Sequence, residues 1–83
     1  MTYELYILPK AKKKLDKFPH SEKIEERLKE LKNFPNVRNI IKIGENLYRM
    51  RIGSYRALFK VYEADSIIVI VNVDVRGRVY KQF

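Results

Sequence analysis

The chain has 83 residues, of which 46% are hydrophobic, a formal net charge of +8 and no cysteine, so disulfides and thiolate metal sites are excluded. A chain of this length buries only about 60–65% of its unfolded surface, so we expect a single domain, residues 1–83, with one layer of helix on one sheet. The longest apolar run, residues 67–71, is too short to cross a bilayer, and the N-terminus lacks the pattern of a secretion signal. Composition therefore predicts a basic cytoplasmic protein that does not span a membrane.

The first half of the chain predicts one strand followed by two amphipathic helices. Apolar residues alternate in residues 3–8, which is typical of a strand, and Pro9 ends this strand and starts a helix. Apolar residues then recur at helical spacing up to Pro19. In the second helix we expect Ser21 as the N-cap, because acidic residues follow it in the first turn, and we expect the helix to end before Pro35.

After residue 36 the helical period gives way to the alternation that is typical of strands. A continuous apolar run at residues 66–73 favours a strand in the interior of the sheet, covered on both faces. The fold class that follows is α+β: an N-terminal strand, a two-helix hairpin, and a mainly antiparallel twisted sheet of about four strands packed on the helices. These four strands are expected at residues 38–43, 47–52, 55–62 and 66–73, and residues 75–80 are expected to form a loop or a short edge strand.

The feature that points most directly to function is the hairpin around residues 53–54. A two-residue loop that begins with Gly predicts a tight turn, and this turn places Arg51 directly opposite Arg56. Like charges opposite each other destabilise a hairpin, so folding alone gives no reason for the pair, whereas a bound polyanion supplies one. Alternation gives this basic face four side chains: Arg49, Arg51, Arg56 and Lys60.

The other candidate groups point to structural roles. His20 is the only histidine and lies in the turn between the helices, a position typical of a surface residue. The carboxylates of the second helix occupy positions that pair with lysines or with the helix dipole. The three glycines lie in separate turns and form no phosphate-binding loop. The sequence therefore predicts no metal site and no cofactor, and leaves Arg, Lys and Tyr side chains as the reactive groups.

Arginine and tyrosine side chains suit the cleavage of RNA. Cleavage through the 2′-hydroxyl of the RNA itself needs a proton acceptor there, a proton donor at the leaving 5′-oxygen, and positive charge around the phosphate. Arginines supply the charge. Tyr80 has three interpretations: it transfers a proton, it stacks on a base, or it packs at the sheet edge. Tyrosine, with a reference pKa of about 10, acts as a base at neutral pH only where cations stabilise the phenolate.

Two motifs resemble those of a known toxin family. The core Y-R-x-R-x-G-x-Y-R at residues 48–56, followed by R-x-x-x-Y at residues 76–80, is similar to the RelE/ParE toxin superfamily, and most of all to archaeal-type RelE toxins. The resemblance covers essentially the whole chain and implies a RelE-like fold and a metal-independent endoribonuclease. Together with the basic face, it implies a set of catalytic residues and a set of RNA-binding residues: Arg51, Arg56, Arg76 and Tyr80 in the first, and Arg49, Lys60 and Arg78 in the second.

The resemblance also implies partners. A toxin of this family is held inactive by a cognate antitoxin, for which we expect an acidic toxin-binding segment that folds on contact. Its nucleic-acid partners are mRNA in the ribosomal A site and rRNA, so the expected outcome is mRNA cleavage and inhibition of translation. Two alternatives remain open: a ParE-like inhibitor of DNA gyrase, and a non-catalytic basic module that binds RNA or the ribosome.

Overall fold

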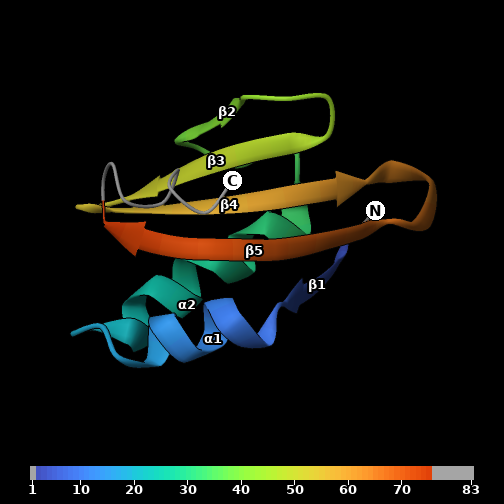
Figure 1. The fold of residues 1–83 in the computed structure, drawn as a ribbon. Coiled ribbons are helices and arrows are strands. Elements are labelled where there is room, and N and C mark those ends of the chain that lie inside the picture. Colours follow the sequence, from blue (N-terminus) through green and yellow to red (C-terminus); the bar gives the residue numbers. More distant parts are fainter. Residues whose placement is uncertain (1, 76–83) are drawn as a thin grey trace.

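Two helices cover one face of a five-stranded sheet in the computed structural model, which describes residues 2–75 (Figure 1). The α+β class expected from the sequence is confirmed. The element expected at residues 75–80 lies outside the described residues from position 76 onward. In chain order the elements are β1 (Glu4–Ile7), α1 (Pro9–Asp16), α2 (Ser21–Lys29), the 3₁₀ turn η1 (Glu30–Asn33), β2 (Ile40–Lys42), β3 (Leu47–Ile52), β4 (Tyr55–Tyr62), the 3₁₀ turn η2 (Glu63–Asp65) and β5 (Ile67–Val75).

The strand order in the sheet is β1-β5-β4-β3-β2. The four strands expected after the helices are all present, and the prediction of an interior β5 is confirmed. The sheet has one strand more than the expected four or so, because β1 joins it as a fifth strand. It pairs in parallel with β5, from Glu4 opposite Ile67 to Ile7 opposite Ile70, whereas the other pairs are antiparallel. The two helices form the long crossover that a parallel pair requires.

The start of α2 differs from the sequence prediction. His20 is the N-cap residue, and its carbonyl oxygen accepts hydrogen bonds from the N–H groups of Lys23 and Ile24. Ser21 is the first helical residue, so its prediction as the N-cap is wrong. The reason is the left-handed backbone of His20, with φ of 63°, which turns the chain sharply enough for α2 to begin at the next residue, Ser21.

The core lies between the helices and the inner face of the sheet. The apolar stripes predicted for the helices are buried, including Leu15, Leu28 and Leu31, each no more than 3% exposed. Complete burial of a large apolar side chain contributes about 1.5–3 kcal/mol, so these residues account for much of the attachment of the helices. The sheet supplies Met50, Ile52, Ala57, Phe59, Val61, Ile68, Ile70 and Val73 to the same core.

A β-bulge in β5 controls which of its side chains reach the outer face. Phe59 of β4 pairs with Ile70, but its neighbour Leu58 pairs with Asn72, so Val71 is an extra residue in the ladder. In a regular strand, residues 72 and 74 follow Ile70 onto the inner face. The bulge instead places Val73 in the core and turns Asn72 and Asp74 to the outer face. Two polar side chains thereby join the face that carries the arginines.

Candidate functional site

The hairpin between β3 and β4 has the register that the sequence predicts. Arg51 lies opposite Arg56, and Met50 lies opposite Ala57. The turn is as tight as expected, and Gly53 has the positive φ, 60°, that a Gly-first two-residue loop requires. The arginine face, as we call the outer face of the sheet, therefore carries the four predicted basic residues: Arg49, Arg51, Arg56 and Lys60.

Asp74 lies next to the arginine pair and was not predicted as part of the site. It is directly opposite Arg56 across β4 and β5, so the charged row Arg51–Arg56–Asp74 runs across three strands. Its side chain is 4% exposed and accepts a hydrogen bond at 2.6 Å from the Nζ atom of Lys14 in α1. The same ammonium group lies 3.2 Å from Oδ1 of Asn72. A buried carboxylate thus compensates part of the positive charge that the hairpin concentrates.

The two arginines of the pair differ in their surroundings. Arg56 is half-buried, and its Nη1 donates to the carbonyl oxygen of Tyr55 at 3.1 Å and, more weakly, to that of Gly53 at 3.4 Å. Arg51 is exposed. The structure therefore gives folding a reason for Arg56, through Asp74 and the hairpin carbonyls. Arg51 remains the member of the pair that points to a ligand.

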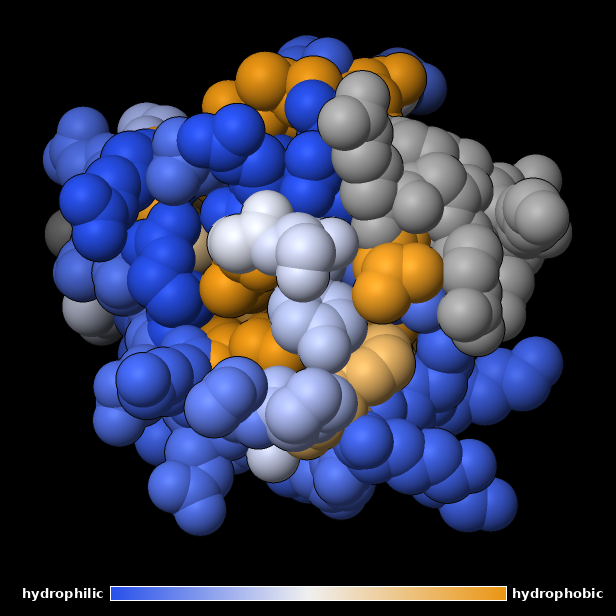
Figure 2. All heavy atoms as spheres, turned by 90° about the vertical axis from the view of Figure 1, so that its left-hand side faces the viewer, coloured by the Kyte–Doolittle hydropathy of each residue, from blue (hydrophilic) through white to orange (hydrophobic). Residues whose placement is uncertain are grey.

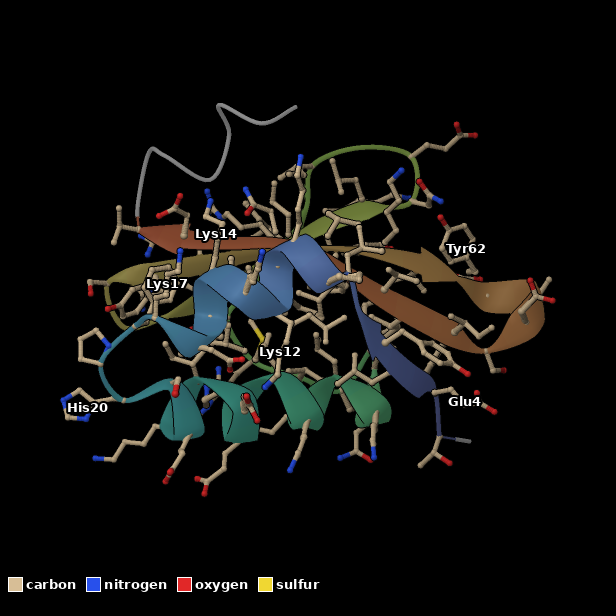
Figure 3. All side chains as sticks on the ribbon, turned by 60° about the horizontal axis from the view of Figure 1, so that its bottom comes forward. Glu4, Lys12, Lys14, Lys17, His20 and Tyr62 are labelled. Carbon is tan, nitrogen blue, oxygen red and sulfur yellow. The ribbon has the colours of Figure 1, made fainter. Side chains whose placement is uncertain are left out.

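Helix α1 adds lysines to this side of the molecule. An open basin of about 830 Å³ lies between α1 and the outer part of β4 and β5, and we call it the lysine basin. Figure 3 shows Lys14 and Lys17 on the side of α1 that is turned toward the sheet. Lysines from the first half of the chain thus adjoin Lys60, one of the predicted site residues. The lining consists of Leu8, Lys10, Lys13, Lys14, Lys17, Lys60, Val71 and Asn72.

The space-filling view shows the end of the molecule that holds the turn between β3 and β4 (Figure 2). Hydrophilic side chains cover most of this surface and surround small apolar patches. Three of the residues predicted for the site, Arg76, Arg78 and Tyr80, lie outside the described residues. The site as described is therefore the charged row, the rest of the arginine face and the lysine basin.

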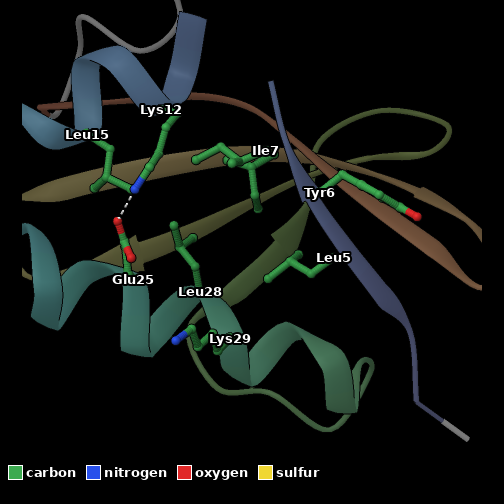
Figure 4. A pocket seen from close by; sticks show the side chains of 9 residues that line it. Leu5, Tyr6, Ile7, Lys12, Leu15, Glu25, Leu28 and Lys29 are labelled. Atoms are coloured by element: carbon green, nitrogen blue, oxygen red, sulfur yellow. Dashed lines mark hydrogen bonds and ion pairs between the residues drawn. The ribbon is translucent and has the colours of Figure 1, made fainter. Parts of the chain in front are cut away.

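A second concave feature lies on the helix side of the molecule and is apolar. It is a groove of about 140 Å³ between β1, α1 and α2, lined by residues that include Leu5, Leu28 and Ile70 (Figure 4). Lys12 closes one part of it with an ion pair of 2.5 Å to Glu25, and it also contacts Asp16 at 3.0 Å. Hydrogen bonds to these two carboxylates raise the pKa of Lys12, and the bond to Glu25 has the larger effect.

Two further observations bear on the chemistry that the site can support. Within residues 2–75, no three His, Cys, Asp or Glu side chains come together where they could hold a metal ion. None of the helices in this part of the chain is long and apolar enough to cross a membrane. The chemistry of the described site is that of fixed positive charges, with one buried carboxylate among them.

The fold and the basic face define the class of protein. The family model for the ParE toxin of the type II toxin–antitoxin system parDE matches residues 5–80. The chain therefore belongs to this toxin family, within the RelE/ParE superfamily. No curated protein sequence matches it.

Solved structures point more closely to the RelE branch. The chain is 33% identical to archaeal RelE from Pyrococcus horikoshii, seen in a RelE–RelB complex, with a TM-score of 0.81 over 94% of this chain and 99% of that one. It is 26% identical to its counterpart in the RelB–RelE antitoxin–toxin complex of Methanococcus jannaschii, with a TM-score of 0.75 over 94% and 98% of the two chains. A mutant of the Escherichia coli toxin RelE in the free state shares the fold at 22% identity, with a TM-score of 0.78 over 98% and 93%.

Proposed function

We propose that this type II toxin is a ribosome-dependent endoribonuclease that cleaves mRNA in the ribosomal A site and thereby inhibits translation in the cytoplasm. The observation that carries the proposal is the register of Arg51 and Arg56 on the outer face of the β3–β4 hairpin. Two guanidinium groups side by side suit a phosphodiester, because each presents a planar fork of donors. The 33% identity to an archaeal RelE supports the same branch of the superfamily.

The reaction that fits this site uses the RNA as its own nucleophile. The 2′-hydroxyl gives its proton to an acceptor as its oxygen forms a bond to the adjacent phosphorus. The bond from phosphorus to the 5′-oxygen breaks, and a donor delivers a proton to that leaving oxygen. Charge that accumulates on the phosphate is stabilised by Arg51 and Arg56, whose guanidinium groups stay protonated at neutral pH. We assign the further catalytic roles to Arg76 and Tyr80, and RNA binding to Arg49, Lys60 and Arg78.

The test is to add the purified protein to translating ribosomes and map the 5′ ends of the mRNA. We expect cuts at positions in the A site, and we expect Arg51→Ala to remove them. Arg38→Ala is the matched control, because Arg38 is exposed and lies before β2, outside the site. Intact mRNA with the unaltered protein, or equal loss of cutting in both variants, contradicts the proposal.

A second function is favoured by one observation, namely that the matching family model describes ParE toxins. On this alternative the chain inhibits DNA gyrase and leaves RNA intact. A supercoiling assay with purified gyrase separates the two, because an endoribonuclease has no effect on it. Binding to ribosomes with neither cleavage nor gyrase inhibition identifies the third alternative, a non-catalytic basic module.

We also propose a cognate antitoxin as the protein partner, with an acidic segment that binds the toxin. The Pyrococcus horikoshii and Methanococcus jannaschii structures are complexes of RelE with RelB, which supports such a partner here. The apolar groove between β1, α1 and α2 offers a surface that a folding segment can cover. Co-expression with the neighbouring small reading frame, followed by co-purification, tests this. Free expression of the toxin alone without an effect on growth contradicts it.

A further inference from the structure

We infer that the lysine basin binds the phosphodiester backbone of RNA, as a second site beside the arginine face. Three lysines of α1 and its C-cap residue Lys17 have the spacing i, i+3, i+4 and i+7 and so form one stripe, roughly 10 Å long: Lys10, Lys13, Lys14 and Lys17. Like charges at i and i+4 destabilise a helix, so this stripe lowers the stability of α1 in the absence of a ligand. A bound polyanion offsets that repulsion.

The ion pairs of the α1 lysines support a binding site on only one side of the helix, the side that faces the basin. Lys12 has two carboxylate partners, Glu25 and Asp16. Lys14 is held by Asp74. The other three lysines of the basin stripe make no ion pair with an acidic residue among those described: Lys10, Lys13 and Lys17. Acidic partners in α1 and α2 thus neutralise the side turned to the groove and leave the basin positively charged.

The basin is continuous with the arginine face. Lys60 and Asn72 line the basin and also project from the outer face of the sheet, and the ammonium group of Lys14 bridges Asn72 and Asp74. Because Asp74 lies opposite Arg56, the charged row ends where the basin begins. An RNA strand bound at the arginine pair can therefore continue onto the basin, where its further phosphates meet the lysines of α1. This inference rests on the proposed function, since it takes RNA as the substrate.

The composition of the basin favours RNA over an acidic protein. Five of the eight lining residues are lysines, and only Leu8 and Val71 are apolar. Protein–protein interfaces are depleted in lysine and have an apolar core, which this surface lacks. Lysine ammonium groups bind phosphates as point charges, with no demand on base sequence. The surface therefore fits a nucleic-acid backbone that the protein reads by charge alone.

The test measures binding of a fluorescein-labelled single-stranded oligouridylate to the full-length protein by anisotropy, over a range of salt concentrations. The variant replaces the three basin lysines that have no acidic partner within residues 2–75: Lys10→Gln, Lys13→Gln and Lys17→Gln. Each phosphate contact contributes about 0.7 to the slope of log affinity against log salt, so we expect the slope to fall by about 2. We also expect affinity at low salt to fall tenfold or more, while the thermal midpoint stays level or rises.

The matched control removes the same charge from α2 and η1: Lys23→Gln, Lys29→Gln and Lys32→Gln, all exposed and outside the basin. The salt dependence of its RNA affinity should equal that of the unaltered protein, and an equal fall of the slope in both variants overturns the inference.

Displacement of the RNA by polyglutamate of equal charge also overturns it, in favour of an acidic protein partner. If the unaltered protein leaves mRNA intact but the basin variant alone loses RNA affinity, the inference holds and the proposed cleavage fails. If the protein cleaves mRNA and the basin variant binds RNA normally, the inference alone fails.

Discussion

Replacement of Asp74 by Asn tests whether the buried carboxylate holds α1 against the sheet. The carboxylate accepts from Lys14 at 2.6 Å and, through Oδ1, from the backbone N–H of Val75 at 2.8 Å. Asparagine keeps the size and one acceptor oxygen but removes the charge. The variant therefore removes the charged partner of Lys14 and leaves its ammonium group beside the amide of Asn72 and the new amide at position 74.

The magnitude follows from burial. Removal of one partner from a fully buried ion pair costs about 3–5 kcal/mol, because the other charge stays uncompensated. Asp74 is 4% exposed, but the side chain of Lys14 is 26% exposed and can turn toward water. We therefore expect a loss of about 2 kcal/mol in the free energy of unfolding, within the range for a hydrogen bond to a charged group. In a domain of this size that lowers the thermal midpoint by roughly 8–16 °C.

The assay is a double-mutant cycle with Asp74→Asn and Lys14→Met, followed by thermal and urea unfolding. We expect a coupling of about 1–2 kcal/mol between the two substitutions. Asp65→Asn serves as the control for loss of an acidic charge, because Asp65 is exposed in η2, and it should change the midpoint little. A coupling below about 0.3 kcal/mol, or equal effects of Asp74→Asn and Asp65→Asn, refutes the view that this ion pair stabilises the fold.

Three further predictions concern the hairpin and the C-terminus. Arg51→Ala and Arg56→Ala should each reduce mRNA cleavage about 100-fold or more. The thermal midpoint should stay the same or rise for Arg51→Ala and should fall for Arg56→Ala; a fall for Arg51→Ala alone would contradict this. Tyr80→Phe should retain cleavage if the ring stacks and lose it if the hydroxyl transfers a proton, and Tyr80→Ala should cleave poorly in both cases. Activity of both variants equal to that of the unaltered protein would identify a packing residue. Gly53→Ala should lower the free energy of unfolding by about 1–2 kcal/mol, because φ at this position is 60°, a conformation that a residue with a Cβ atom adopts only with strain. A clash is not the cause, since the added Cβ meets nothing within 4 Å.

Local signals made the hairpin predictable from the sequence. A two-residue turn fixes the register of its strands, so the position of the turn was enough to place Arg51 opposite Arg56. The apolar stripes of the helices were equally local, and they supply Leu15, Leu28 and Leu31 to the core. The N-cap of α2 was missed because the left-handed backbone of His20 has no side-chain signature, whereas Ser21 has the composition of a cap.

The remaining features depend on contacts between distant segments. The parallel pairing of β1 with β5 joins residues more than sixty positions apart, and no local pattern encodes it. The lysine basin forms because β1 ends at Ile7 and α1 then takes its place beside β5, where Leu8 N–H still donates to the carbonyl oxygen of Ile70. Asp74 was missed because the predicted strand ends at residue 73, whereas β5 extends to Val75, and because regular alternation from Ile70 would place residue 74 in the core. Each of these three misses involves a contact or an irregularity of β5.

The bulge at Val71 yields a last prediction, because this extra residue decides which side chains of β5 lie on each face of the sheet. Deletion of Val71 makes Asn72 follow Ile70 directly, so a regular strand then keeps the observed partners Phe59–Ile70 and Leu58–Asn72 on their present faces. We expect this deletion to retain a cooperative thermal transition. Deletion of Ala57 from β4, which has no bulge, should abolish it, because every side chain beyond the deletion changes face. Far-ultraviolet circular dichroism during heating measures both. Unfolding of the Val71 deletion together with the Ala57 deletion would show that the extra residue is itself required, through the bend that it gives the strand.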